Sequence, residues 1–198
     1  IPYLDLAIIY DESWARDLST YGPYSPKKRI VSANSSDYLT VWPYVNSLNY
    51  YVIRYADLVL WRAEAAIMTN DLETGRMYIN MIRERAKNSQ YVQHIDGSGD
   101  AANYMIEPYA QPFTSQGAAM KALMIERRLE FAQEGHRFFD LVRWGVAAEV
   151  MNAYFEVERT RRTHLSNAQF VAGKHEYAPI PQSQIDLGRG LIKQNPGY

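Results

Sequence analysis

The sequence contains no cysteine. Disulfide bonds, thiolate nucleophiles and cysteine-based metal sites are therefore excluded together. The four histidines, at positions 94, 136, 164 and 175, do not show the spacing of metal ligands. They are expected to be polar surface or helix-packing residues.

The chain also has no excess of one charge, because its 21 Lys and Arg residues are nearly balanced by 22 Asp and Glu residues. No basic field could hold a phosphate backbone, so general nucleic-acid binding is not expected. No run of about 18 apolar residues occurs, so no segment is predicted to span a bilayer. The chain begins at Ile1 with neither an initiator Met nor a signal peptide, and we expect its native start to lie upstream.

Residues 1–50 are predicted to form a loop-rich aromatic arm. Prolines at positions 2, 23, 26 and 43, together with Gly22, favour loops and short extended pieces. The arm is also rich in rings, which are Trp14, Tyr21, Tyr24, Tyr38, Trp42, Tyr44 and Tyr50.

From about residue 51 the apolar residues follow alternating steps of three and four, which is typical of one helix face. That face comprises Ile53, Ala56, Leu60, Ala63 and Ile67. Asn70 and Asp71 then offer an N-cap for a second helix that runs through Ile79 and Ile82. The two helices form a hairpin of the size of one tetratricopeptide-type repeat. One such repeat cannot close its own core, so exposed apolar surface is expected where neighbours would pack.

The remainder divides into a loop, a long helical region and a tail. Residues 88–113 are predicted to be a loop, because they contain "DGSGD" and two prolines. A helical region is predicted from about Ser115 to Val150, with Gly135 as a break or kink. Residues 155–176 are polar and basic, and "RTRR" (159–162) is expected to be a solvated loop. The tail from Tyr177 is predicted to be extended and turn-rich.

The stretch "ERRLEFAQEGHRFFDLVRWG" (126–145) has two interpretations. In a helix that continues through Gly135, charges of alternating sign lie three apart and attract one another; these are Glu134, Arg137, Asp140 and Arg143. The alternative is acid–base catalysis of the kind seen in glycoside hydrolysis, by Glu130, Glu134, His136 and Asp140. Neighbours of alternating charge hold each other ionised, which favours a structural ionic seam. Trp61 and Trp144 lie within helical blocks and are predicted to be core residues.

Five blocks of sequence occur in a fixed order along the chain, namely "RYADLVLWRAEA" (54–65), "YINMIRERA" (78–86), residues 126–145, "YAPIP" (177–181) and "QNPGY" (194–198). Together they resemble the C-terminal part of the SusD/RagB family of outer-membrane nutrient-binding proteins. The resemblance covers residues 51–198 well and the arm only loosely. Gly75 stands where the family usually has Ala, and Gln184 where an acidic residue is common.

The resemblance implies an all-α protein of tetratricopeptide-like helix pairs with irregular, loop-rich segments. In the domain so implied, residues 51–198 form the helical region of one larger domain and residues 1–50 the aromatic arm. Proteins of this kind lie at the bacterial cell surface, anchored in the outer membrane through a lipidated cysteine. That cysteine would be upstream of this chain. They capture oligosaccharide, or peptide in the RagB branch, and pass it to a SusC-like TonB-dependent transporter. They are not enzymes.

Sugar rings have flat apolar faces edged by hydroxyl groups, so exposed aromatic rings flanked by polar groups are candidate contacts. The candidates in the arm are Trp14, Tyr21, Tyr24, Trp42 and Tyr44, with Arg16, Asp11 and Asn46 as hydrogen-bonding neighbours. The alternative is that these rings pack beneath the arm.

The segment "DGSGDAANYMIE" (96–107) partly matches a calcium-binding loop. Asp96, Ser98, Asp100 and Glu107 fall at positions 1, 3, 5 and 12 of the EF-hand pattern. The turn-forming glycine at position 6 is replaced by Ala101, which favours a plain surface loop over a structural calcium site. No other cofactor is expected.

The sequence therefore predicts a non-catalytic binder of oligosaccharide that works with its own upstream portion and with the transporter. Three alternatives remain. A RagB-type peptide binder would have a groove with main-chain hydrogen-bonding groups. An interaction scaffold without a small ligand would bury Trp14, Tyr21, Tyr24 and Trp42. A hydrolase would hold two carboxylates about 5–9.5 Å apart in an open cleft.

Overall fold

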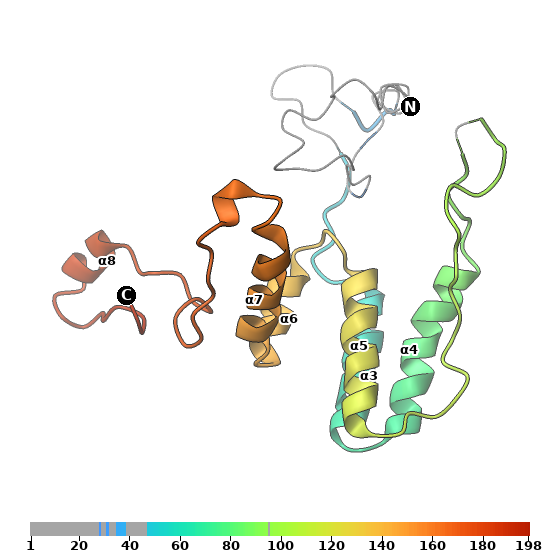
Figure 1. Ribbon diagram of the computed structural model, residues 1–198, viewed down its shortest axis with the longest axis horizontal. Helices are drawn as coiled ribbons and strands as arrows, with labels where there is room; N and C mark the ends of the chain where they lie inside the picture. The colour runs from blue at the N-terminus through green and yellow to red at the C-terminus, as the bar shows by residue number, and fades with distance from the viewer. Residues whose placement is uncertain (1–27, 29–30, 32–34, 39–46, 95) are drawn as a thin grey trace. The chain divides into compact units, whose positions relative to one another are not determined.

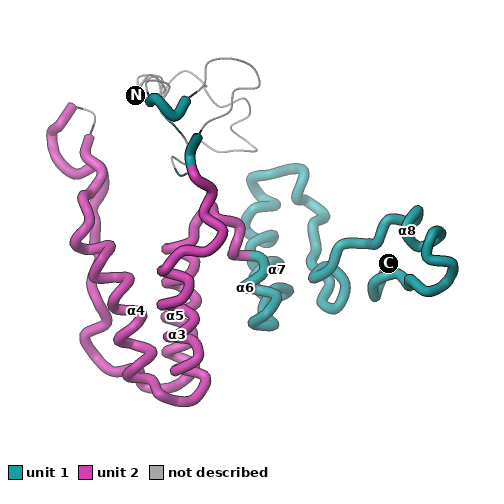
Figure 2. Tube along the Cα trace, turned by 180° about the vertical axis from the view of Figure 1, so that it is seen from behind, with its two compact units in different colours: residues 1–48, 138–198 teal, residues 49–137 magenta. Residues whose placement is uncertain are grey.

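The computed structural model describes residues 28, 31, 35–38, 47–94 and 96–198. Their regular structure is helical, and an isolated β-bridge joins Gln93 and Asp100. The chain divides into two compact units, which are residues 49–137 and residues 1–48 with 138–198 (Figures 1 and 2). The predicted all-α class is confirmed.

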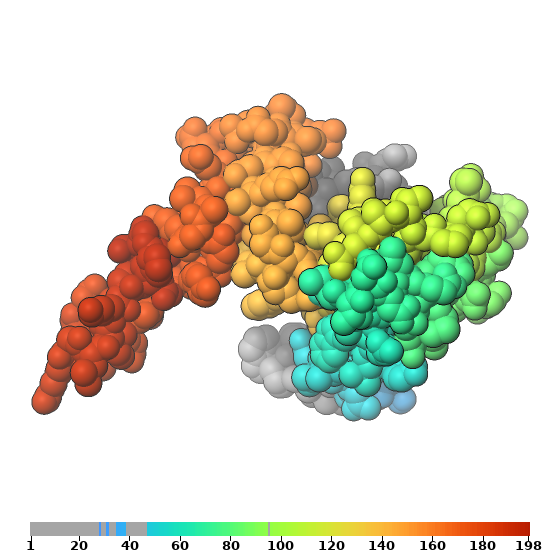
Figure 3. Space-filling view, turned by 90° about the horizontal axis from the view of Figure 1, so that it is seen from below, coloured from blue at the N-terminus to red at the C-terminus, as the bar shows by residue number. Residues whose placement is uncertain are grey.

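The first of these units, residues 49–137, is a bundle of three helices. The helices are α3 (Tyr55–Met68), α4 (Leu72–Lys87) and α5 (Gln116–Glu130). Each packs on the other two, and Figure 3 shows α3 and α4 side by side. A turn of three residues separates α3 from α4, so the predicted helical hairpin is present.

Side-chain oxygens at the helix starts fix the boundaries of α4 and α5. The carboxylate of Asp71 accepts the N–H of Thr74 at 3.1 Å, and the hydroxyl of Ser115 accepts the N–H of Ala118 at 3.1 Å. These caps satisfy N–H groups that have no partner inside the helix. The N-cap predicted at Asp71 and the helix start predicted near Ser115 are both confirmed.

The core of the three-helix unit is built from the predicted face of α3. Leu60, Ala63 and Ile67 are fully buried, and they pack with Ile79 of α4 and Leu123 of α5. Gly75 allows α4 to approach closely here, because a Cβ at this position would lie 2.5 Å from Cγ1 of Ile67. The glycine that departs from the family pattern is therefore required by this packing.

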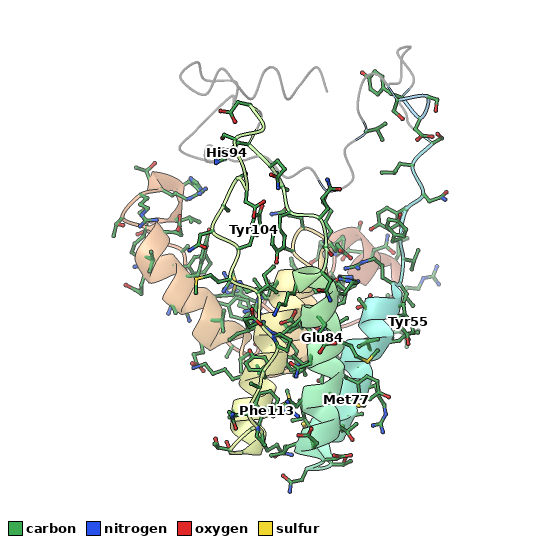
Figure 4. All side chains as sticks on the ribbon, turned by 90° about the vertical axis from the view of Figure 1, so that its right-hand side faces the viewer. Tyr55, Met77, Glu84, His94, Tyr104 and Phe113 are labelled. Atoms are coloured by element: carbon green, nitrogen blue, oxygen red, sulfur yellow. The ribbon has the colours of Figure 1, made fainter. Side chains whose placement is uncertain are left out.

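One side of α3 keeps large apolar side chains in contact with solvent. Four of them follow helical spacing along it, namely Tyr55, Leu58, Trp61 and Met68. Tyr55, labelled in Figure 4, is 72% exposed. The expected apolar surface is thus present. Trp61 is 43% exposed, so its assignment to the core is wrong. Burial of a helix face depends on what covers it, which the pattern within the helix does not contain.

The region from Ser115 to Val150 is three helices and not one. After α5 come α6 (His136–Arg143) and α7 (Ala147–Glu158). Gln133, Gly135 and Gly145 adopt φ of 66°, 85° and 71°, which end the right-handed helix at these points. The break predicted at Gly135 is therefore confirmed, and the ladder of charges that a helix continuing through Gly135 would have formed is absent. Asp140 and Arg143, both within α6, do pair at 2.9 Å.

The second unit contains α7 and the tail. Leu141, Ala147 and Phe170 form its small buried cluster. Helix α7 reaches Glu158, beyond the predicted end, and is followed by a 3₁₀ turn (Thr163–Leu165). Trp144 is half-buried beneath the guanidinium of Arg143, so it is only partly a core residue.

In the tail, hydrogen bonds join two of the five blocks that resemble the family, namely residues 177–181 and 194–198. The side chain of Gln194 accepts the N–H of Ile180 at 2.7 Å and donates to its carbonyl at 2.9 Å. Asn195 donates to the carbonyl of Ala178, and the hydroxyl of Tyr198 donates to that of Tyr177. The short helix α8 (Gln182–Leu187) lies between the blocks and was not predicted.

Candidate functional site

The charged stretch forms a compact ionic cluster with the start of α3. The cluster consists of Arg54, Arg85, Glu130 and Glu134. Arg54 donates from Nη1 to Glu130 at 2.6 Å, and from Nη2 and Nε to the two carboxylate oxygens of Glu134 at 2.8 and 3.0 Å. Its Nη2 also donates to the main-chain carbonyl of Glu130 at 3.2 Å. Arg85 reaches the second oxygen of Glu130 at 2.5 Å.

This Arg54 cluster is buried on its acidic side. The side chains of Glu130 and Glu134 are 9% and 3% exposed. Burial alone would lower the pKa of Arg54, but hydrogen bonds and charge attraction from both carboxylates outweigh it and raise the pKa. Buried carboxylates held this firmly by a cation favour a structural role over proton transfer. The stretch thus acts as an ionic seam, although Arg54, and not a neighbour on the same helix, is the partner of Glu134.

Three of the four residues named for a catalytic alternative are committed to ion pairs with arginine. Glu130 and Glu134 are engaged by Arg54, and Asp140 is engaged by Arg143. His136 lies 3.9 Å from the carboxylate of Glu134, which exceeds hydrogen-bond distance. A general acid and base must reach a reacting group, and this arrangement gives no such access.

A second ion pair lies deeper in the unit. Nη2 of Arg127 lies 3.7 Å from Oδ1 of Asp57, and their side chains are 2% and 1% exposed. The other carboxylate oxygen of Asp57 accepts the N–H of Arg54 at 3.2 Å and thereby caps α3. The guanidinium groups of Arg54 and Arg127 both lie within 5.0 Å of the ring centre of Phe131. Phe131 therefore joins the two ionic groups through cation–π contacts.

A third buried carboxylate of this unit, that of Glu126 in α5, pairs with Arg83 at 2.9 Å. Burial raises the pKa of the Glu126 carboxyl above its ordinary value of 4.5, and the hydrogen bond from Arg83 only partly opposes this effect. The folded state therefore binds this proton more tightly than the unfolded chain does, and the wild type loses stability as the pH rises from 4.5 through the raised pKa.

Glu126→Gln removes that loss. We expect the stability of the variant, measured relative to the wild type by urea unfolding, to increase as the pH rises through this window. Glu73→Gln is the control of opposite sign, because the hydrogen bond from Arg76 lowers the pKa of Glu73. Its relative stability should fall as the pH rises from the lowered pKa through 4.5 and should level off above that value. Parallel pH profiles for the two variants would contradict this assignment.

Three of the four predicted calcium ligands, Asp96, Asp100 and Glu107, have partners within the protein. Asp96 accepts the N–H of Ser98 at 2.9 Å, Asp100 accepts from Gln93 at 2.5 Å, and Glu107 pairs with Lys87 at 2.6 Å. Within the described residues, no group of three or more acidic or histidine side chains could hold a metal ion. A structural calcium site remains a sequence prediction, and no geometry here supports it.

The seven sugar-contact residues predicted in the arm lie outside the described residues. They are Trp14, Arg16, Tyr21, Tyr24, Trp42, Tyr44 and Asn46. Asp11, their proposed neighbour, also lies outside. Whether these rings are exposed or buried therefore stays a prediction.

The three-helix unit has a groove that the sequence did not point to. Its volume of about 570 Å³ lies in the range typical of small-ligand sites. The segment 108–114 forms one wall, with Tyr109 and Phe113 in edge-to-face contact at 5.2 Å. Lys121 and Ile125 of α5 form the other wall. The rings and prolines of 108–113 were the only sequence signal, and they suggested no more than a loop.

Side chains of α4 hold the wall formed by 108–114 by bonding to the main chain of Tyr109. Asn80 accepts the N–H of Tyr109 at 2.8 Å and donates to its carbonyl at 3.0 Å. Arg76 donates to the same carbonyl at 2.6 Å. Both main-chain groups of Tyr109 are therefore occupied, and at this point the groove presents rings and not a free peptide edge.

Of the helices that the structure describes, none has the length and apolar character needed to cross a membrane.

Comparison with known proteins decides the family. The model of the SusD family matches residues 15–198. The chain belongs to the SusD family. A SusD-like protein of Formosa agariphila, P25, is 29% identical over 156 residues, which are 77% of this chain and 25% of that protein. A second from the same organism, P38, is 30% identical over 117 residues, covering 57% and 20% of the two chains.

Solved structures agree with the SusD-family fold. The crystal structure of a SusD homolog from Bacteroides thetaiotaomicron has a TM-score of 0.58 and 26% identity, covering 77% of this chain and 28% of that one. That of a SusD superfamily protein from Bacteroides vulgatus has a TM-score of 0.51 and 28% identity, covering 74% and 27%. The chain spans about a quarter of the length of the SusD-like relatives that it matches. The SusD family is one of non-catalytic nutrient-binding surface proteins.

Proposed function

We propose that this protein takes part in binding oligosaccharide at the bacterial cell surface and in delivering it, uncleaved, to a SusC-like TonB-dependent transporter. The observation that carries the proposal is the SusD-family match over residues 15–198. As part of it, the protein is held at the outer membrane by a lipidated cysteine that lies upstream of this chain.

The described structure supports saccharide over the alternatives in two ways. The carboxylates of the charged stretch are paired with arginines, which does not suit a hydrolase. The groove wall presents Tyr109 and Phe113 while the main-chain groups of Tyr109 are occupied, which does not suit capture of a peptide by strand addition. Ligand contact by stacking on Trp14 and Trp42 of the arm remains part of the proposal.

Calorimetry against neutral oligosaccharides tests this function, with the chain alone and joined to its upstream portion. We expect Trp14→Ala and Trp42→Ala each to raise the Kd about tenfold, because a stacked ring commonly contributes more than 1 kcal/mol. Tyr177→Ala is the matched control, since it removes an exposed ring from the tail.

Three results would contradict parts of the proposal. Binding of peptides and of no glycan would favour the RagB-type function. An equal loss of affinity in Tyr177→Ala would contradict a specific role of the arm in binding the ligand. Absence of binding to both ligand classes by the joined protein would favour an interaction scaffold.

A further inference from the structure

A polar cavity lies in the second unit, between α7 and the segment that follows the 3₁₀ turn. Its volume of about 510 Å³ is large enough for a small ligand. Six polar residues line it, namely Asn152, Glu156, Arg159, Ser166, Asn167 and Gln169. The remaining lining residue is Ala168, so six of the seven lining residues can form hydrogen bonds.

The irregular wall of this cavity is fixed by two side chains, Asn152 of α7 and Arg159, which caps the C-terminal end of that helix. Asn152 donates to the carbonyl of Phe170 at 3.0 Å and accepts its N–H at 2.8 Å. Arg159 donates to the carbonyls of Phe155 and Ala168, at 3.2 Å in each case. Because Phe170 is buried in the core of this unit, the segment is anchored at its end. A binding wall that is fixed before the ligand arrives loses less entropy on binding.

Three polar side chains on that wall are available to form hydrogen bonds with a ligand. Within the part of the chain that the structure describes, no hydrogen bond is made by the side chains of Ser166, Asn167 or Gln169, and all three are exposed. Beside them, Glu156 and Arg159 pair at 3.2 Å, so the wall has a carboxylate and a guanidinium with no net charge.

This set of groups matches a neutral ligand with many hydroxyl groups. Each hydroxyl both donates and accepts, and an amide side chain offers both complements. The carboxylate accepts from hydroxyls and the guanidinium donates to them. An apolar ligand would leave these groups unpaired, and a strongly anionic one would meet Glu156.

We propose that this cavity binds the hydroxyl edge of one sugar unit of a neutral oligosaccharide, with Asn167 and Gln169 as its main contacts. The inference rests on the proposed function and adds to it a contact site separate from the aromatic arm. It contains no aromatic ring among its lining residues, so it recognises hydroxyl positions and not the flat face of the sugar.

The test is calorimetry of the full chain with maltohexaose, cellohexaose, laminarihexaose and mannohexaose. We expect the double variant Asn167→Ala with Gln169→Ala to bind its best hexasaccharide about tenfold or more weakly, as the loss of two or more hydrogen bonds implies. Asn167→Asp with Gln169→Glu keeps the side-chain sizes but removes the amide donors, so it should weaken binding as well. Gln90→Ala with Asn103→Ala is the matched control at exposed positions elsewhere.

The outcomes separate this site from the function. Unchanged affinity in both double variants would overturn the cavity and leave saccharide binding intact. An equal loss in the control pair would also overturn it. Binding of none of the hexasaccharides by the wild type, or of peptides at this cavity instead, would overturn both. Thermal unfolding of each variant checks that the loss is not one of folding, which is expected to be unaffected because the replaced groups make no internal hydrogen bond.

Discussion

Arg54→Ala is expected to lower the free energy of unfolding by about 3 kcal/mol. The guanidinium joins Glu130 and Glu134 to the start of α3 through four hydrogen bonds, and both carboxylates are nearly inaccessible to water. Its removal leaves two buried negative charges close together with less compensation. The value lies at the low end of the range for buried pairs, because Arg85 still reaches Glu130. Urea unfolding followed by circular dichroism measures the loss.

Arg85→Ala is the matched control. It removes a cation from the same Glu130, but its side chain is 53% exposed, so the expected loss is below about 1 kcal/mol. Arg54→Lys should fall between the two, because a single ammonium cannot satisfy two carboxylates and a carbonyl in the same planar arrangement. Equal losses in Arg54→Ala and Arg85→Ala would show that burial of the cluster does not control its energy.

Arg127→Met is expected to cost about 3–5 kcal/mol, since it leaves Asp57 buried without its cation. The distance of 3.7 Å is too long for a hydrogen bond, so the pair is held by charge attraction in a dry environment. The double variant Asp57→Asn with Arg127→Met removes both charges and keeps an acceptor that can cap α3.

Most of the stability should therefore return in the double variant. Replacing a whole buried pair by uncharged side chains is commonly neutral or stabilising, whereas removing one partner is not. Urea unfolding of the two single variants and the double variant gives the coupling energy directly. Additive losses in the double variant would contradict the view that the uncompensated charge causes the cost.

Local rules were sufficient for the hairpin of α3 and α4. The apolar steps through Leu60 and Ile67, and a capping carboxylate at Asp71, all act within one helix or one turn, so the sequence contained the necessary information. The structural role of the charged stretch was also predictable, because charges among apolar residues must be paired when they are buried.

What the sequence could not provide was the identity of distant partners. Glu134 was assigned to a ladder on its own helix, yet it lies in a turn and bonds Arg54, 80 residues away. Trp61 was placed in the core because it lies within a helical block, but no pattern within a helix says which of its faces is covered. The polar cavity was missed for a similar reason, since its wall is irregular and is held by Asn152 and Arg159 from another segment.

The Arg54 cluster also has a consequence for the order of folding. Arg54 meets Glu130 across 76 residues, whereas α3 and α4 are joined by a turn of three. Closing a long loop costs more entropy than closing a short one, so the local hairpin can form first and the cluster after α5 has docked. Contacts made after the transition state act on the unfolding rate and leave the folding rate almost unchanged. The Arg54 cluster then controls the unfolding rate of the three-helix unit, and with it the lifetime of the folded unit.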